Sequence, residues 1–265
     1  MAALLETRDL SKFFGGLYAA NGVSLAIEAG EVRCLIGPNG AGKSTLFKLI
    51  IGTYQPSGGQ VFFDGHDITP LESHRRVNRG LSIKFQVPGI FLELGVEQNL
   101  RIALQRKVAP ARMNDETERL LTFLDLAASR HLAAGNLSHG QQQWLEIGMA
   151  IALQPKLLLL DEPTAGMSPE ETFKTGELVK RLNADGMTIV VIEHDMTFVR
   201  QIARKVTVLH FGKVFLEGTL DEVVDNDDVA RIYLGKECNS HPQASLRCAF
   251  PLGGGQCAWE RPGAH

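Results

Sequence analysis

The sequence predicts an α/β fold around a mostly parallel sheet, and three observations lead to that prediction. A glycine-rich stretch at residues 37–45 lies between an apolar run typical of a strand and an apolar run typical of a helix. Two further segments are typical of strands buried on both faces: the continuous apolar run at 157–160 and the mostly apolar run at 187–192. Segments with helical periodicity alternate with these runs, which favours a parallel sheet covered by helices.

The glycine-rich stretch matches the pattern G-x-x-x-x-G-K-[ST] at every position, between a strand and a helix as this pattern requires. Its glycines leave room for a curled loop whose backbone N–H groups face one anion, and the following helix adds its positive dipole end. Lys43 is expected to reach the β- and γ-phosphates, and the Ser44 hydroxyl to hold Mg²⁺. The predicted class is a P-loop NTPase with a RecA-like core. The predicted nucleotide-binding residues here are Gly37, Pro38, Asn39, Gly40, Ala41, Gly42, Lys43, Ser44 and Thr45.

Composition and charge bound the remaining possibilities. The chain has 265 residues, 44% of them hydrophobic, which is enough for a substantial core, and its net charge of −3 gives no electrostatic reason to bind nucleic acid. No run of about 18 apolar residues could span a membrane, and the first residues become charged too soon for a signal peptide. The four cysteines fit no metal-binding spacing. A cytoplasmic protein without a nucleic-acid partner is expected.

The first third of the chain predicts an N-terminal antiparallel β layer. Strands are expected at Leu4–Leu10, Val23–Ile27 and Gln60–Phe63, the second with alternating apolar and polar residues. Phe13 and Phe14 precede a Gly-Gly turn. They could pack in the core, which their spacing favours, or stack on a nucleobase. Both interpretations remain open at this point.

A helical insertion subdomain is predicted between two strands of the parallel sheet, over about residues 88–153. The strand before it, Leu81–Phe85, ends at Gln86. Leucine-rich periodicity and the breaks at Pro110 and Pro155 indicate where its helices lie, and Ser138 has the residue type of an N-cap. The expected helices cover residues 97–104, 116–127 and about 142–153.

The rest of the chain continues the alternation of strands and helices up to residue 235. Capping boxes at Ser168–Glu171 and Thr219–Glu222 predict helix starts. Residues 236–265 carry three cysteines, three consecutive glycines and no apolar period, which predicts a disordered or weakly ordered tail after an ordered unit at 4–235. The expected elements are helices at 169–182 and about 196–203, a hairpin of strands 206–210 and 214–217, and a C-terminal helix after Thr219.

Polar residues follow two neighbouring buried strands. Asp161 and Glu162 come directly after the run 157–160, and His194 follows the run 187–192 with one residue between. Ligands bind at the carboxyl ends of such strands, so Asp161 is expected in the Mg²⁺ shell and Glu162 beside an attacking water as general base. A structural Asp-Glu pair and a structural histidine are the alternatives. The upstream P-loop favours the catalytic roles, with His194 at the γ-phosphate.

Taken together, residues 4–235 resemble the ATP-binding cassette (ABC) ATPases. The motifs occur in that family's order, which is the P-loop, Gln86, Leu137–Gln141, Asp161-Glu162 and His194. The resemblance implies that Phe14 stacks on the adenine of ATP, and that Gln86 touches Mg²⁺ and the attacking water while it senses a transporter partner. The implied catalytic residues are Glu162, His194 and Gln86, and the implied Mg²⁺ ligands are Ser44, Gln86 and Asp161.

The same resemblance implies a second phosphate site. The signature segment Ser138-His139-Gly140-Gln141 would bind the γ-phosphate of ATP held by the opposite subunit, chiefly through Ser138 and Gly140. A serine at a helix N-terminus with a glycine nearby forms an anion site, and each chain already holds one P-loop, so the second site would be filled in trans. ATP would join two chains, and hydrolysis would release them.

Two residues depart from the family pattern. His139 stands where glycine is usual, but Ser138 and Gly140 remain, so contact with the phosphate is expected to survive. Ser168 stands where the family usually has aspartate. This change puts communication between two ATP sites through that residue in doubt, but it leaves hydrolysis itself intact.

Three segments resemble the ATPases of importers for branched-chain amino acids and for urea or short amides: 137–147, 193–196 and 229–235. Residues 84–100 are closest to the urea type. The resemblance implies a protein on the inner face of the cell membrane. It would work with permease subunits, a second ABC ATPase subunit (a heterodimer is favoured over a homodimer) and, indirectly, a solute-binding protein. Three alternative functions remain. The first is the ATPase of a lipid or lipopolysaccharide exporter, against which the ending 232–235 argues. The others are a soluble ABC protein outside transport and, least favoured, a small-molecule kinase.

Overall fold

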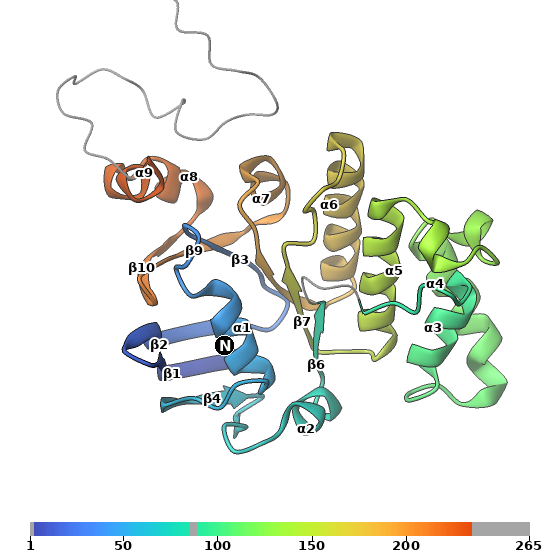
Figure 1. The fold of residues 1–265 in the computed structure, drawn as a ribbon, viewed down its shortest axis with the longest axis horizontal. Coiled ribbons are helices and arrows are strands. Elements are labelled where there is room, and N and C mark those ends of the chain that lie inside the picture. The colour runs from blue at the N-terminus through green and yellow to red at the C-terminus, as the bar shows by residue number, and fades with distance from the viewer. Residues whose placement is uncertain (1–2, 85–88, 235–265) are drawn as a thin grey trace, which may run out of the picture.

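Two β-sheets organise the computed structural model, which describes residues 3–84 and 89–234 (Figure 1). One sheet has six strands and the other has four, and helices lie around and between them. The predicted α/β class is therefore confirmed. Gln86 and the tail at 236–265 lie outside the described residues, so what the sequence predicts for them stays a prediction.

The larger sheet carries the parallel core. Its strands run in the order β10-β9-β3-β8-β7-β6, and each neighbouring pair is parallel except the β9–β10 hairpin. The residues of β3, β7 and β8 are all buried, as their apolar runs predicted. The strands are β3 (Val32–Ile36), β6 (Leu81–Lys84), β7 (Leu157–Asp161), β8 (Thr188–Ile192), β9 (Lys205–His210) and β10 (Lys213–Gly218).

The smaller sheet is antiparallel, with strands in the order β2-β1-β4-β5. Helix α1 (Lys43–Ile51) lies between the two sheets, because Leu46, Phe47 and Ile50 belong to one buried cluster with side chains of both. β1 and β2 extend beyond the predicted ranges, so Phe14 is the last residue of a strand. The strands are β1 (Ala3–Phe14), β2 (Leu17–Glu28), β4 (Gly58–Phe63) and β5 (His66–Asp67).

A short helix that the sequence analysis did not predict, α2 (Ser73–Asn78), holds the end of α1. Its Arg76 is fully buried and donates hydrogen bonds to the carbonyl oxygens of Leu49 and Ile50 at 2.7 and 2.8 Å. These carbonyls lie at the C-terminus of α1, where a helix leaves acceptors without intrahelical donors and the dipole attracts cations. Burial lowers the pKa of Arg76 to about 10, so the guanidinium stays charged at neutral pH.

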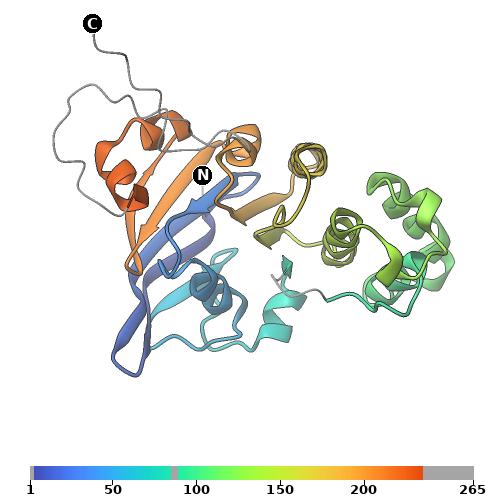
Figure 2. The same cartoon turned by 45° about the horizontal axis from the view of Figure 1, so that its top comes forward.

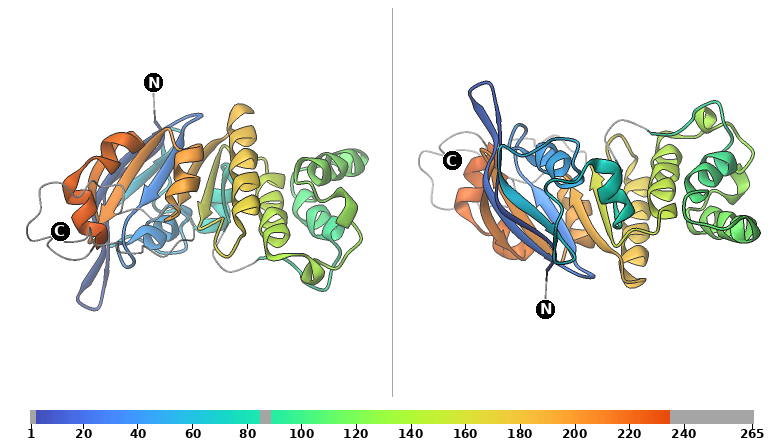
Figure 3. Two further views of the ribbon diagram at one scale, coloured as in Figure 1. Left: turned by 90° about the horizontal axis from the view of Figure 1, so that it is seen from above. Right: turned by 90° about the horizontal axis from the view of Figure 1, so that it is seen from below.

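The predicted helical insertion forms a lobe at one end of the molecule, opposite the C-terminal helices α8 (Leu220–Val224) and α9 (Asp227–Leu234) (Figures 2 and 3). Its helix α4 ends earlier than predicted, because Asp125 takes a left-handed conformation (φ 58°) and a 3₁₀ turn follows at Ala127–Ser129. Helix α5 begins earlier than predicted, directly after its N-cap Ser138. The helices are α3 (Val96–Leu104), α4 (Met113–Phe123) and α5 (His139–Ala152).

The C-terminal third follows the prediction except at its end. The single helix expected after Thr219 is two helices, because the Asn226 side chain accepts hydrogen bonds from the N–H groups of Asp228 and Val229 and starts a new helix there. The capping boxes at Ser168 and Thr219 are both present. The helices are α6 (Pro169–Ala184), α7 (Met196–Ile202), α8 (Leu220–Val224) and α9 (Asp227–Leu234).

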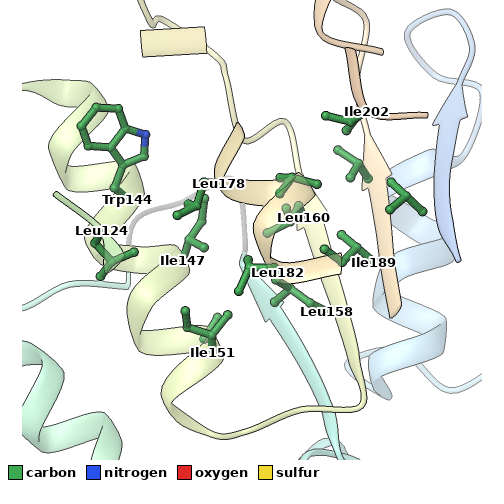
Figure 4. Close-up of a cluster of buried hydrophobic side chains, with 14 of the residues drawn as sticks. Leu124, Trp144, Ile147, Ile151, Leu158, Leu160, Leu178, Leu182, Ile189 and Ile202 are labelled. Carbon is green, nitrogen blue, oxygen red and sulfur yellow. The ribbon is translucent and has the colours of Figure 1, made fainter. Parts of the chain in front are cut away.

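Apolar packing joins the helical lobe to the sheet through α5. Trp144 and Ile147 of α5 face α6 and β7, and Leu160 and Leu178 approach them from those elements (Figure 4). Burying large apolar side chains such as these stabilises the fold by about 1.5–3 kcal/mol each. Within residues 3–84 and 89–234, no helix is long and apolar enough to cross a lipid bilayer.

Candidate nucleotide site

The P-loop connects β3 to α1 at the centre of the larger sheet, since β3 has β8 and β9 as its neighbours. Gly42 takes a left-handed conformation (φ 99°), and a Cβ there would overlap the carbonyl oxygen of Ala19, so only glycine fits. The predicted strand, loop and helix are therefore present, and the loop is held closely against β2.

The side chain of Lys43 is buried inside the curl of the P-loop. Its ammonium donates hydrogen bonds to the carbonyl oxygens of Gly37 at 2.7 Å and Pro38 at 3.0 Å. Burial lowers the pKa of Lys43, and the negative charges of Glu162 and Asp161 oppose that shift. The side chain thus places a cation inside the curl of the loop, where a phosphate chain could replace the two carbonyl oxygens as its partner.

Asp161 ends β7 and is 5% exposed, next to the first turn of α1. Ser44 donates a hydrogen bond from its Oγ to the Asp161 Oδ1 at 3.4 Å. Burial raises the pKa of Asp161, and the bond from Ser44 opposes the shift. A carboxylate and a hydroxyl oxygen side by side are ligands that suit Mg²⁺, which binds through one or two protein oxygens together with phosphate and water. The described residues contain no cluster of three or more His, Cys, Asp or Glu side chains that could hold a metal without such help.

Glu162 and His194 lie together at the carboxyl ends of β7 and β8. The His194 Nδ1 is 3.9 Å from the Glu162 Oε1. Glu162 has φ 47°, a conformation that a non-glycine residue seldom adopts and that clusters at functional sites. Its N–H donates to the carbonyl oxygen of Ile192 at 3.0 Å, which ties the two strand ends together. The structure therefore brings together two of the three predicted catalytic residues.

Glu193 has a role at the site that the sequence analysis missed. Its carboxylate is 1% exposed and accepts hydrogen bonds from the Thr164 N–H at 3.1 Å, the Thr164 hydroxyl at 2.6 Å and the His194 N–H at 3.0 Å. These bonds join the loop after β7 to the loop after β8 and so position Glu162 and His194. A carboxylate directly after a fully buried apolar run was the signal in the sequence.

Phe14 lies in the β1–β2 hairpin and is 45% exposed, so core packing, the interpretation that its spacing favoured, is wrong for this residue. Its ring meets the edge of Tyr54 at 5.4 Å between centroids and 72° between planes. The Lys12 ammonium is 5.2 Å from the Phe14 centroid. The ring is thus supported on one side and accessible to solvent, as a base-stacking residue needs to be.

The signature segment starts α5. The Ser138 Oγ accepts a hydrogen bond from the Gln141 N–H at 3.2 Å, and the Gln141 Oε1 accepts one from the Ser138 N–H at 3.1 Å. His139 places its Nε2 3.0 Å from the carbonyl oxygen of Ala165, in the loop after β7. In Figure 1, α5 and α1 lie on opposite sides of β7, so the segment begins a helix remote from the P-loop helix of its own chain.

Comparison with known proteins identifies the family. The fold and the P-loop site define a nucleoside triphosphatase. A family model described as "ABC transporter" matches residues 20–165, more than half of the chain. The chain therefore belongs to the ABC transporter family and is an ATPase of that family.

The chain is similar to transport ATPases over nearly its whole described length. It is 36% identical over 250 residues to the high-affinity branched-chain amino acid transport ATP-binding protein BraF of Pseudomonas aeruginosa, covering 88% of this chain and 98% of BraF. It is 34% identical over 238 residues to the lipopolysaccharide export system ATP-binding protein LptB of Acidithiobacillus ferridurans, covering 89% of this chain and 99% of LptB.

Solved structures support the same assignment. A nucleotide-free ATP-binding cassette from an ABC transporter superposes with a TM-score of 0.80 at 32% identity, covering 88% of this chain and 100% of that one. The dimeric structure of MJ0796, a bacterial ABC transporter cassette, gives a TM-score of 0.74 at 27% identity, covering 82% and 98%. The predicted resemblance to the ABC ATPases and the predicted α/β fold are confirmed.

Proposed function

We propose that the chain is the ATP-hydrolysing subunit of an importer for branched-chain amino acids or for urea and short amides. It would act on the inner face of the cell membrane through separate permease subunits, with a solute-binding protein as an indirect partner. The similarity to BraF over 88% of the chain carries this proposal. The ATPase unit would comprise residues 4–235.

The cis part of the site would bind one ATP. Lys43 would exchange the carbonyl oxygens of Gly37 and Pro38 for the β- and γ-phosphates, and the exposed ring of Phe14 would stack on the adenine. Ser44 and Asp161, together with Gln86, would hold Mg²⁺, which supplies positive charge for the phosphate oxygens when it is bound.

Glu162 would act on the attacking water. Its carboxylate lies at the strand end beside His194, and its backbone is fixed by the bond to Ile192 and by the Glu193 network. It would accept a proton from the water as the water attacks the γ-phosphate, while His194 would donate a hydrogen bond to that phosphate. Gln86 would contact the same water and report on the permease.

The trans part of the site would come from a second ATPase subunit. Ser138, His139, Gly140 and Gln141 begin α5, away from the P-loop of the same chain, so they would meet the γ-phosphate bound by a partner subunit. A similar cassette, MJ0796, has a dimeric structure. The pairing of two different ATPases remains our expectation for the native transporter.

Export of lipopolysaccharide or another lipid is the second candidate, because the similarity to LptB covers as much of the chain as the similarity to BraF. Co-purification separates the two functions. The importer proposal expects this chain to be recovered with permeases that take up a small solute when ATP is supplied to reconstituted vesicles. Recovery with lipid-extracting membrane subunits, and no ATP-dependent uptake of an amino acid or an amide, would favour export.

A further inference from the structure

The carboxylate of Glu171 lies on the phosphate site of the signature segment in its own chain. The Ser138 Oγ donates a hydrogen bond to the Glu171 Oε1 at 3.2 Å. The same oxygen lies against Gly140, so closely that a Cβ on Gly140 would overlap it. The two residues that would grip the partner's γ-phosphate are therefore both in contact with one carboxylate oxygen of α6.

Glu171 is fixed in this place by its role at the start of α6. Its second oxygen, Oε2, accepts a hydrogen bond from the Ser168 N–H at 3.0 Å, and its own N–H donates to the Ser168 Oγ at 3.3 Å. The bonds from Ser168 hold the pKa of Glu171 below its ordinary value. The capping box thus leaves one oxygen, Oε1, facing Ser138 with a negative charge.

One hydroxyl proton cannot serve two acceptors. Ser138 has a single O–H, which in this chain is donated to Glu171, while its lone pair accepts from the Gln141 N–H. A γ-phosphate that binds here must take that proton and must also come close to the Glu171 charge, which repels it. The Ser138–Glu171 bond and the bond from Ser138 to phosphate exclude each other.

We infer that Glu171 is an internal competitor for the γ-phosphate at the trans phosphate site. This inference rests on the proposed function, because it requires the site at Ser138 to be filled by a partner's nucleotide. Glu171 raises the ATP concentration at which two subunits close.

The test compares two variants, each of which replaces one glutamate by glutamine and so removes one negative charge. Glu171→Gln keeps an amide oxygen for the Ser168 N–H, because glutamine also completes a capping box. Because that single oxygen is taken by the Ser168 N–H, the amide NH₂ group faces Ser138, so the variant removes both the negative charge and the acceptor of the serine proton. Glu170→Gln is the matched control, because Glu170 is one residue away and exposed, and pairs with Lys174 at 3.1 Å.

The measurement is the ATP concentration that gives half-maximal dimer, followed by sedimentation of full-length protein that carries Glu162→Gln to prevent turnover. Glu171→Gln should lower this concentration about 3- to 10-fold, as expected when one charge-assisted contact is removed. Glu170→Gln should change it by less than about twofold, because exposed charges are screened. An unchanged or higher midpoint in Glu171→Gln, or an equal shift in Glu170→Gln, would overturn the competitor role.

Ser138→Arg separates failure of this inference from failure of the proposed function. Arginine fills the phosphate site, so no ATP-dependent dimer should form. If Ser138→Arg dimerises normally, the trans site is wrong and the role of Glu171 is lost with it. If Ser138→Arg blocks the dimer while Glu171→Gln leaves the midpoint unchanged, only the role of Glu171 is wrong.

Discussion

The two regions of the chain that we propose bind phosphate are built differently. In the P-loop region the two charged side chains, Lys43 and Asp161, are buried: Lys43 donates to the backbone carbonyl oxygen of Gly37, and Asp161 accepts a hydrogen bond from Ser44. In the signature region Ser138 is exposed, and its hydroxyl is shared between the Gln141 N–H and the Glu171 carboxylate. The backbone contacts of Lys43 fit a site that binds ATP within one chain. The contact of Ser138 with a side-chain carboxylate can be replaced when the phosphate of a second chain arrives.

The largest effect should come from the group that acts on water. We expect Glu162→Gln to lower the ATP hydrolysis rate by about 10²- to 10⁴-fold, the range for loss of a general base, and to leave ATP binding intact. Phosphate release and equilibrium nucleotide binding measured on the same preparation check this. A variant that hydrolyses ATP at the normal rate would remove Glu162 as the base and weaken the contrast between the two regions.

Lys43→Ala should weaken ATP binding by the P-loop region and leave the signature region unchanged. Loss of the buried ammonium removes charge-assisted bonds to two phosphates, and we expect ATP affinity to fall by about 3 kcal/mol, or about 100-fold. Isothermal titration of the monomer measures it, with Lys180→Ala on the exposed face of α6 as the control. Equal affinities of the two variants would contradict the assignment of the P-loop.

Phe14→Ala tests the base-stacking part of the same region. The loss of one stacked base should weaken ATP binding by about 2 kcal/mol, within the range of about 1–3 kcal/mol for aromatic stacking. Binding of inorganic triphosphate, which has no base, should not change. If both ligands lose the same affinity, Phe14 supports the hairpin and does not touch the base.

Ser138→Ala should have the smallest effect on binding and should separate the two regions most clearly. ATP affinity of the monomer should stay the same, because we propose that the segment binds only a partner's nucleotide, while hydrolysis should fall by about tenfold with the loss of one hydrogen bond to phosphate. The lost N-cap should also cost about 1 kcal/mol of stability. Thr219→Ala removes an equivalent cap from α8 and should lower the melting temperature without lowering hydrolysis. Weaker ATP binding by the Ser138→Ala monomer would count against a trans site.

The sequence was a good guide wherever the determinants are local. The P-loop, the buried strands and the capping box at Ser168 were all placed correctly, because each depends on residues within a few positions of one another. Boundaries failed where one residue changes the backbone locally, as Asp125 does with its left-handed conformation at the end of α4.

The parts that could not be predicted depend on contacts between distant segments. Arg76 explains helix α2 only once the end of α1 is known to lie beside it, and Glu171 meets Ser138 across 33 positions of sequence. The exposure of Phe14 likewise follows from the length of the β1–β2 hairpin, which the hydrophobic pattern underestimated. Such contacts are set by topology, which a single sequence does not display.

The central position of β3 has a consequence for biosynthesis. Its two neighbours, β8 and β9, begin at Thr188 and Lys205, so the strand that leads into the P-loop has no hydrogen-bonded partner until the last third of the chain has been made. At about 5–20 residues per second, the roughly 150 residues between β3 and β8 take about 8–30 s to synthesise. During that interval the edges of a strand with four apolar residues out of five, Val32–Ile36, have no partner, and ATP cannot yet stabilise the chain. Nascent chains of this protein should therefore depend on chaperones more than its modest size suggests.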